Sequence, residues 1–248
     1  MKKFGLIGYP LSHSFSQKYF SEKFGKEKIA DCVYENFSLP SINLLPAILA
    51  NQPDLKGLNV TIPYKEQVIP FLHFSNEVVK QIGACNCINI QDGKLSGFNT
   101  DVYGFEQSLK TSLRPFHAKA LILGTGGASK AVAYVLEKAG IDYKLVSRNP
   151  VQGSEKYIGY EQITHSIISS YTLIVNTTPI GMYPHIDQCP PLPYHFLSSN
   201  HYLFDLIYNP AKTLFLQKGE EHGAIIQNGS DMLIIQAEES WKIWNNLM

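Results

Sequence analysis

Polar residues gather at the ends of several predicted strands, and their types suit the binding of a small polar ligand. Three clusters stand at 12–16, 59–65 and 99–101, and Asn86 lies inside an apolar run. Open α/β sheets leave a crevice for ligands where their strands end. Each cluster has an ordinary alternative, because Ser14 could cap the helix that follows and Asn86 could be a satisfied strand amide. Taken together, the clusters predict a ligand site.

A glycine-rich turn follows the apolar run 120–123 and precedes a helix that we expect to begin near Ser129. Gly124 permits a tight turn, while Gly126 and Gly127 carry no side chain that would keep a pyrophosphate from backbone N–H groups. The helix dipole adds a positive end. Because Ser129 replaces the third glycine of G-x-G-x-x-G, a plain turn is the alternative to the dinucleotide-binding turn that we favour.

The next predicted strand ends at Val146. An NAD site would place an Asp or Glu about 20 residues after the glycines, against the ribose 2′-hydroxyl. This chain has Ser147, Arg148 and Asn149 after the strand. A guanidinium suits a 2′-phosphate through its charge and its planar hydrogen bonding. We therefore predict NADP rather than NAD; the alternative is that Arg148 is a solvated loop residue.

The elements that must position these residues alternate along the chain, and short apolar runs between amphipathic stretches predict an α/β fold. We expect strands at 4–7, 57–62, 84–90, 120–123, 143–146, 173–176, 202–206 and 224–226. We expect helices at 14–24, 102–113, 129–138, 213–222 and 231–245. Periodicity is interrupted at 111–119, which indicates a break before a second domain.

Composition favours a small, mostly uncharged partner. The chain has 248 residues with 21 basic and 21 acidic side chains, which fits two small domains and leaves no field for nucleic acid or anionic lipid. No apolar stretch reaches the roughly 20 residues of a membrane-spanning helix. Four sparse cysteines and the absence of a signal-peptide pattern predict a cytoplasmic protein.

Cys85 and Cys87 flank Asn86 in a predicted strand, so we expect both thiols on the face opposite Asn86. A C-x-C pair without further ligands at metal-binding spacing is typical of buried thiols and not of a zinc site. We expect no metal.

Eight segments resemble those of the shikimate dehydrogenase family, in the same order and spacing and along nearly the whole chain. They are G-Y-P-L-S-H-S-F-S at 8–16, N-V-T-I-P-Y-K at 59–65, G-A-C-N-C at 83–87, N-T-D at 99–101, G-T-G-G-A-S-K at 124–130, N-T-T at 176–178, D-L-I-Y-N-P at 205–210 and M-L-I-I-Q-A at 232–237. The resemblance implies an NADP-dependent oxidoreductase that reversibly reduces 3-dehydroshikimate to shikimate, in chorismate and aromatic amino-acid biosynthesis.

The resemblance also implies roles for individual residues. Lys65 and Asp101 would form the catalytic pair. The substrate would be bound by Ser14, Ser16, Asn59, Thr61, Lys65, Asn86, Asp101, Tyr208 and Gln236, with the two serines on its carboxylate and Tyr208 closing the pocket. The cofactor would be bound by Gly124, Thr125, Gly126, Gly127, Ala128, Ser147, Arg148, Asn149, Thr178, Leu206 and Gly229.

Two domains with a cleft between them are implied as well, in a monomer or homodimer. Residues 1–101 and 229–248 would form an α/β substrate domain with a mixed sheet, and 102–228 a Rossmann-like, doubly wound NADP-binding domain. The chain departs from the family pattern at Gln17, where a proline is usual, and at Asp231, where a glycine is common. The stretch 150–152 lacks the usual second basic residue, which predicts a weaker preference for NADP.

Ketone reduction needs a hydride on carbon and a proton on oxygen. We expect Lys65 to supply the proton and Asp101 to orient it, or the pair to share it; the alternative is an ordinary surface salt bridge. Rival functions are an NAD-dependent quinate or quinate/shikimate dehydrogenase and a non-catalytic metabolite sensor on the same scaffold. Hydrolysis through Ser14 or Ser16 with His13 lacks a G-x-S-x-G turn.

Overall fold

The computed structural model describes residues 1–11, 15–151 and 153–247, which divide into two compact units. Unit 1 comprises Met1–Thr100 and Ala237–Met248, and unit 2 comprises Asp101–Gln236. The break expected at 111–119 lies inside unit 2, because that stretch is only the loop between a helix and the strand that follows. The domain limits implied by the family resemblance stay a prediction.

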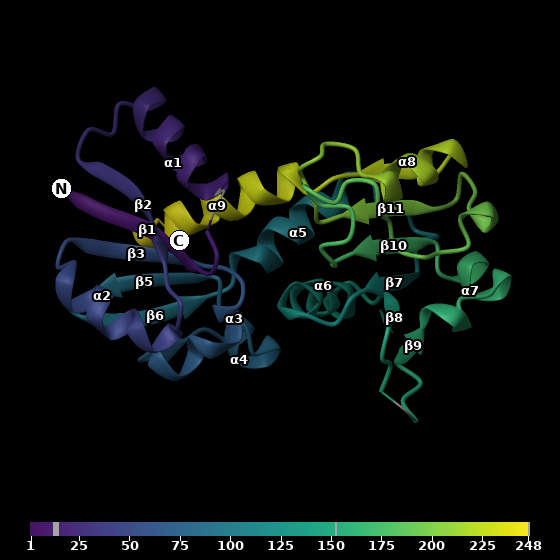
Figure 1. The fold of residues 1–248 in the computed structure, drawn as a ribbon, viewed down its shortest axis with the longest axis horizontal. Coiled ribbons are helices and arrows are strands. Elements are labelled where there is room, and N and C mark those ends of the chain that lie inside the picture. Colours follow the sequence, from purple (N-terminus) through teal and green to yellow (C-terminus); the bar gives the residue numbers. More distant parts are fainter. Residues whose placement is uncertain (12–14, 152, 248) are drawn as a thin grey trace. The chain divides into compact units, whose positions relative to one another are not determined.

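Unit 1 is built on a six-stranded mixed sheet (Figure 1) with the order β2-β1-β3-β5-β6-β4. Its strands are β1 (Lys2–Gly8), β2 (Cys32–Ser38), β3 (Leu55–Val60), β4 (Phe74–Ser75), β5 (Cys87–Gln91) and β6 (Lys94–Phe98). β1 runs parallel to β2 and β3, whereas β5 runs antiparallel to β3 and β6. The ends of β1, β3 and β6 and the start of β5 therefore lie at one edge of this sheet.

Side chains along β1 alternate between two apolar clusters, one on each face of the sheet. The helices of unit 1 are α1 (Phe15–Lys26), α2 (Leu45–Asn51), α3 (Tyr64–Gln67), α4 (Glu77–Ile82) and the last part of α9 (Ser230–Trp244). On one face, Trp244 of α9 stacks on Phe4 with ring centroids 4.9 Å apart. A Cβ on Gly57 would lie 2.3 Å from Trp244, so glycine is required where this helix meets the sheet.

Unit 2 is built on a six-stranded parallel sheet with the order β12-β11-β10-β7-β8-β9 (Figure 1). Its strands are β7 (Lys119–Leu123), β8 (Asp142–Ser147), β9 (Tyr157–Gly159), β10 (Leu173–Asn176), β11 (Tyr202–Asp205) and β12 (Ile225–Gln227). Its helices are α5 (Thr100–Lys110, whose first residue is in unit 1), α6 (Gly127–Lys138), α7 (His165–Ser170), α8 (Leu214–Glu221) and the first part of α9. The predicted α/β class, with one mixed and one doubly wound sheet, is confirmed.

Two local expectations were wrong. α6 begins at Gly127 instead of Ser129, because Gly126 already has the extended backbone of an N-cap. β5 begins at Cys87, since the N–H of Cys85 bonds to the carbonyl of Lys65 outside the sheet. As a result Cys85 and Cys87 pack into the clusters on opposite faces of the sheet, and do not share one face.

None of the helices in the described part of the chain is long and apolar enough to cross a membrane. Within the same residues, no three His, Cys, Asp or Glu side chains are grouped as metal ligands would be.

Candidate active site

A buried network of neutral side chains occupies the edge of the unit 1 sheet where β3 ends. Asn59, the last but one residue of β3, is 4% exposed. Its Oδ1 accepts a hydrogen bond from the Tyr34 hydroxyl at 2.8 Å, and its Nδ2 donates to Ser240 Oγ at 3.0 Å and to the Asn86 carbonyl at 3.4 Å. Both polar ends of this amide are therefore held in a fixed orientation.

Asn86 and Thr100 continue the same network across the start of β5 and the start of α5. The backbone N–H of Thr100 donates to Asn86 Oδ1 at 2.6 Å, and Asn86 Nδ2 donates to Thr100 Oγ1 at 3.0 Å. Thr100 Oγ1 also lies 3.2 Å from Ser240 Oγ. We call this set the neutral network below: Tyr34, Asn59, Asn86, Thr100 and Ser240. Each residue is buried and belongs to a different helix, strand or loop.

Lys65 is bonded to Cys85, and the residue before Asp101 is bonded to Asn86. The carbonyl of Lys65, in α3, accepts a hydrogen bond from the N–H of Cys85 at 2.7 Å. Asp101 directly follows Thr100, which is bonded to Asn86, and stands in the first turn of α5. Both residues are half-buried, and both take part in polar contacts of their own. Thr61, also half-buried, follows β3.

The serine-rich segment is described only in part, since Ser14 and His13 lie outside the described residues. Ser16 is half-buried in the first turn of α1. Burial raises the pKa of the Tyr34 hydroxyl well above its usual value, while a hydrogen bond with Ser16 acts to lower it. Ser16 is thereby placed next to the neutral network.

Two further predicted substrate residues belong to unit 2. Gln236 is 6% exposed, and its side-chain amide Nε2 donates to the Leu233 carbonyl at 3.0 Å within α9. A Cβ on Gly104 of α5 would meet the Gln236 Cβ at 3.1 Å, so α5 and α9 approach closely there. Tyr208 is half-buried after β11, and burial raises the pKa of its hydroxyl.

The glycine-rich turn of unit 2 has the backbone that the sequence predicts. Gly124, directly after β7, has φ +108°, and a Cβ there would lie 2.8 Å from Thr177 Oγ1 and 3.0 Å from Thr178 Cγ2. Both the left-handed backbone and the contact with the end of β10 exclude larger residues. Gly126 caps α6 without a side-chain hydrogen bond, and a Cβ on it would meet no atom within 4 Å.

Ser147, Arg148 and Asn149 form the turn at the end of β8. The N–H of Asn149 donates to Ser147 Oγ at 3.2 Å, and Arg148 is exposed. Burial raises the pKa of the Tyr160 hydroxyl, and the charge of the Arg148 guanidinium acts in the opposite direction.

Thr178, Leu206 and Gly229 lie together at the same edge of the unit 2 sheet. Thr178 donates from its N–H and its hydroxyl to Asn176 Oδ1, at 3.0 and 2.7 Å. The N–H of Leu206 donates to the Asn176 carbonyl at 3.0 Å. A Cβ on Gly229 would lie 2.2 Å from the Leu206 carbonyl oxygen, so only glycine fits beside that turn.

Comparison with known proteins identifies the family. The family described as shikimate dehydrogenase substrate binding domain matches residues 6–88. A protein of Methanosphaera stadtmanae named shikimate dehydrogenase (NADP(+)) is 36% identical over 257 residues, covering 97% of this chain and 90% of the relative. The chain belongs to the shikimate dehydrogenase family.

Solved structures of the family and its neighbours share the fold. A shikimate dehydrogenase crystallised with NADP+ has a TM-score of 0.87 and 33% identity, over 99% of this chain and 90% of the other. A quinate dehydrogenase of Corynebacterium glutamicum in complex with NAD has a TM-score of 0.85 and 27% identity, over 99% and 94% of the two chains. The shikimate dehydrogenase fold therefore also occurs with another substrate and cofactor.

Unit 2 fits the dinucleotide cofactor that is typical of shikimate dehydrogenases. The first N–H groups of α6 carry no side-chain cap, and the space around Gly126 is open, which leaves room for a pyrophosphate at a helix N-terminus. Arg148 is exposed at the end of the next strand, with no carboxylate in the 147–149 turn. These features favour a dinucleotide that carries an extra phosphate.

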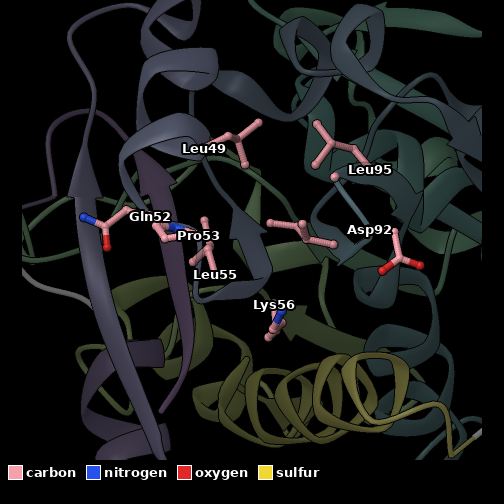
Figure 2. Close-up of a pocket in the computed structure, with 9 residues that line it drawn as sticks. Leu49, Gln52, Pro53, Leu55, Lys56, Asp92 and Leu95 are labelled. Carbon is pink, nitrogen blue, oxygen red and sulfur yellow. The ribbon is translucent and has the colours of Figure 1, made fainter.

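Unit 1 has a pocket of about 270 Å³ (Figure 2). It is lined by Leu49, Gln52, Pro53, Leu55, Lys56, Ile90, Asp92, Gly93 and Leu95. These residues stand at the end of α2, at the start of β3 and around the β5–β6 turn, whereas Asn59 and Asn86 stand near the other ends of β3 and β5. The pocket is therefore not part of the dehydrogenase site predicted from the sequence.

Sequence reasoning missed several residues that the structure places in the site. Tyr34 and Ser240 hold Asn59. Asp205 accepts hydrogen bonds from Asn176 and from Thr213. Ser240 gave one signal, because it is a polar residue on the apolar face of the last predicted helix. Tyr34 gave none, since nothing in its neighbourhood marks it as a partner of a distant amide.

Proposed function

We propose that this chain is a shikimate dehydrogenase, which interconverts 3-dehydroshikimate and shikimate with NADPH and NADP+ in chorismate and aromatic amino-acid biosynthesis. The observation that carries the proposal is the near full-length likeness to relatives of that name. The neutral network and the glycine-rich turn of the two units support it, because they supply the two kinds of binding surface that the reaction needs.

The residues of unit 1 suit a polyhydroxylated ring. Each ring hydroxyl can donate and accept, and amide and hydroxyl side chains do the same. In the proposal ring hydroxyls are bound by Asn59, Thr61, Asn86, Asp101 and Gln236. Ser14 and Ser16 bind the carboxylate, and Tyr208 closes the pocket. The buried contacts of Asn59 and Asn86 support this role, since they fix the amides before substrate arrives.

The residues of unit 2 that would hold the cofactor are the glycine-rich turn 124–128, the turn 147–149, and Thr178, Leu206 and Gly229. Backbone N–H groups at the start of α6 would bind the pyrophosphate, and Arg148 would bind the 2′-phosphate. When bound, the nicotinamide supplies or accepts the hydride.

Proton transfer is assigned to Lys65 and Asp101. In the reducing direction Lys65 Nζ donates a proton to the substrate oxygen as the carbonyl becomes a hydroxyl, and its charge stabilises the negative charge that develops there. Asp101 orients the ammonium and shares its proton. In the oxidising direction the pair accepts the proton from the hydroxyl. The assignment is supported by two bonds to neighbouring residues, from Cys85 to the carbonyl of Lys65 and from Thr100, which precedes Asp101, to Asn86.

The test is to follow absorbance at the reduced-nicotinamide band with purified protein, shikimate or quinate, and NADP+ or NAD+. We expect the highest kcat/KM with shikimate and NADP+. A higher value with quinate and NAD+ would favour the second candidate, which the similarity to a quinate dehydrogenase with NAD suggests. Binding of both ligands without turnover would identify a sensor.

The proposal includes a cytoplasmic enzyme that acts as a monomer or homodimer, without nucleic acid or membrane. All four cysteines are free thiols, which suits a reducing compartment. Size-exclusion chromatography with light scattering would give the oligomeric state, and cell fractionation the location.

A further inference from the structure

A buried carboxylate joins the ends of two central strands of unit 2. Asp205 ends β11 and pairs in register with Asn176, which ends β10. Both side chains are 0% exposed. Neither has a place in the substrate or cofactor set that the sequence predicts, and Asp205 cannot touch a ligand because none of its surface is accessible. Its role must therefore be exerted through other residues.

Three neutral donors converge on this carboxylate. Asn176 Nδ2 and the N–H of Ile207 both donate to Asp205 Oδ1 at 3.0 Å, and Thr213 Oγ1 donates to Asp205 Oδ2 at 2.6 Å. Thr213 is also the N-cap of α8, where its oxygen accepts the N–H of Leu216 at 3.4 Å. Its hydroxyl proton is thus directed at Asp205. The arrangement suits an ionised carboxylate, which is an acceptor only.

Holding a charge here costs folding free energy. Burial raises the pKa of Asp205 to about 6, while the hydrogen bonds from Thr213, Ile207 and Asn176 act to lower it. The protein interior therefore disfavours the charge, and a buried charge is expensive without full compensation. Local choices that lower stability tend to occur at functional sites.

The groups that Asp205 holds lead directly to predicted cofactor residues. Its bond to the Ile207 N–H fixes the turn that begins at Leu206, whose carbonyl packs against Gly229. Its bond to Asn176 Nδ2 leaves Asn176 Oδ1 facing Thr178, which donates to it twice. Loss of the carboxylate would let the Asn176 amide rotate and exchange its two ends, and Thr178 would lose both bonds.

We propose that Asp205 is a positioning residue for the cofactor: its carboxylate fixes the Thr178 turn and the Leu206 turn in the shape that binds the dinucleotide. This inference rests on the proposed function in taking NADPH as the ligand. Asp205, Asn176, Thr178 and Thr213 are called the carboxylate network below.

The experiment measures NADPH binding without turnover, by the fluorescence of the reduced nicotinamide on titration with each protein. Asp205→Asn keeps the shape but replaces an acceptor with a donor. We expect its Kd for NADPH to rise about tenfold or more, in line with the loss of a charge-assisted hydrogen bond. The KM for shikimate should change less than twofold. Asp142→Asn is the matched control, since Asp142 is exposed at the opposite end of the unit 2 strands.

A second pair of variants tests the same contact without touching the carboxylate. Thr213→Val removes the donor and should weaken NADPH binding severalfold, whereas Thr213→Ser keeps the hydroxyl and should restore it. A purely structural role would not produce this split, because melting temperature and both ligand affinities would then fall together in Asp205→Asn and Thr213→Val.

Wild-type affinity for NADPH in Asp205→Asn and Thr213→Val, or an equal loss of NADPH and shikimate affinity, would overturn the inference. A wild-type protein that binds NADPH but does not oxidise shikimate would refute the proposed function alone, provided that Asp205→Asn still weakens NADPH binding. A wild-type protein that binds no dinucleotide would overturn both.

Discussion

Both units gather polar groups at one edge of a sheet, but they hold these groups in place by different means. In unit 1 the neutral network consists of amides and hydroxyls, held by hydrogen bonds such as Tyr34 to Asn59. In unit 2 the carboxylate network is centred on the charge of Asp205. A neutral network keeps its bonds across the physiological pH range, whereas a buried carboxylate with a pKa of about 6 loses its charge on mild acidification. We therefore expect the carboxylate network to be more sensitive to pH than the neutral network.

The largest expected effect separates chemistry from cofactor binding. Lys65→Ala should lower kcat by about 10²- to 10⁴-fold, because it removes the proposed general acid, while the Kd for NADPH stays within twofold. Stopped-flow absorbance and fluorescence titration measure the two quantities. Lys56→Ala is the control, since Lys56 is an exposed lysine at the other edge of the same sheet. Near-normal turnover in Lys65→Ala would remove Lys65 from the mechanism.

The next effect should be confined to unit 2. Gly124→Ala places a Cβ at φ +108° and 2.8 Å from Thr177 Oγ1. A strained backbone of this kind costs about 1–3 kcal/mol, and relief by movement of the turn should weaken NADPH binding at least tenfold. Gly140→Ala carries similar backbone strain at φ +69° with open space around the Cβ, so it should lower stability without affecting NADPH. Calorimetric titration with NADPH measures the Kd of both variants. Equal Kd values for Gly124→Ala and Gly140→Ala would contradict the prediction.

A smaller effect should be confined to unit 1. Tyr34→Phe removes the donor to Asn59 Oδ1 and leaves a buried acceptor unsatisfied, which costs about 1–3 kcal/mol. Part of this loss should appear as a rise of about fivefold in the KM for shikimate, with the KM for NADPH unchanged. Tyr143→Phe is the control, because the Tyr143 hydroxyl donates to Glu137, which is paired with Lys156 in unit 2. A parallel rise in both KM values would show that the two networks do not act separately.

The smallest effect concerns stability against pH. His117 is 1% exposed; its Nδ1 accepts the N–H of Arg114 at 3.0 Å and its Nε2 lies 3.2 Å from the Asn200 carbonyl. Burial lowers the pKa of His117, so its contribution is present above the unfolded value of about 6.5 and is lost as pH falls through the folded pKa. Thermal unfolding between pH 8 and 5 should show a steeper loss in wild type than in His117→Asn.

Asp205 acts on stability with the opposite sign. Its pKa in the folded protein, about 6, lies above the unfolded value of about 3.9, so its protonation adds stability below that range and this gain is lost as pH rises through 6. As pH falls through 6, the free energy of unfolding should therefore gain a contribution from Asp205 in the wild type that is absent in Asp205→Asn. The difference in melting temperature between wild type and variant should change with pH in opposite directions for His117→Asn and Asp205→Asn. A change in the same direction would contradict one of the two predictions.

The sequence could predict the strands that carry continuous apolar runs, such as β7 and β10, because burial on both faces leaves a clear pattern. It did not predict β2, where polar residues interrupt the run. It also missed the strands β4, β6 and β9 and the short helices α2, α3, α4 and α7. The turn between β5 and β6 could have been found, since Asp92-Gly93 is a hairpin signal and both residues have positive φ.

In the candidate site, the sequence identified the residues that stand in family motifs. It did not identify the residues whose side chains hold them in place. Asn59, Asn86 and Gly124 stand in quoted motifs, and the structure gives each a fixed environment. Ser240 and Tyr34 act on Asn59 from α9 and β2, 181 and 25 residues away. Partners brought together by tertiary packing form no local motif. Spacing can mark a polar residue on an apolar helix face, as at Ser240, but it cannot say which distant residue that side chain binds.

The contact of Trp244 with Phe4 and Gly57 also bears on how the polypeptide is made. All residues of unit 2 leave the ribosome before the last turns of α9. Unit 1 cannot complete its core until those turns cover one face of its sheet. Until then, Phe4, Phe20 and Phe24 lack their ring contacts with Trp241. A chain truncated before residue 237 would therefore lack the helical cover of one face of the unit 1 sheet and should be prone to aggregation, although its first hundred residues are present.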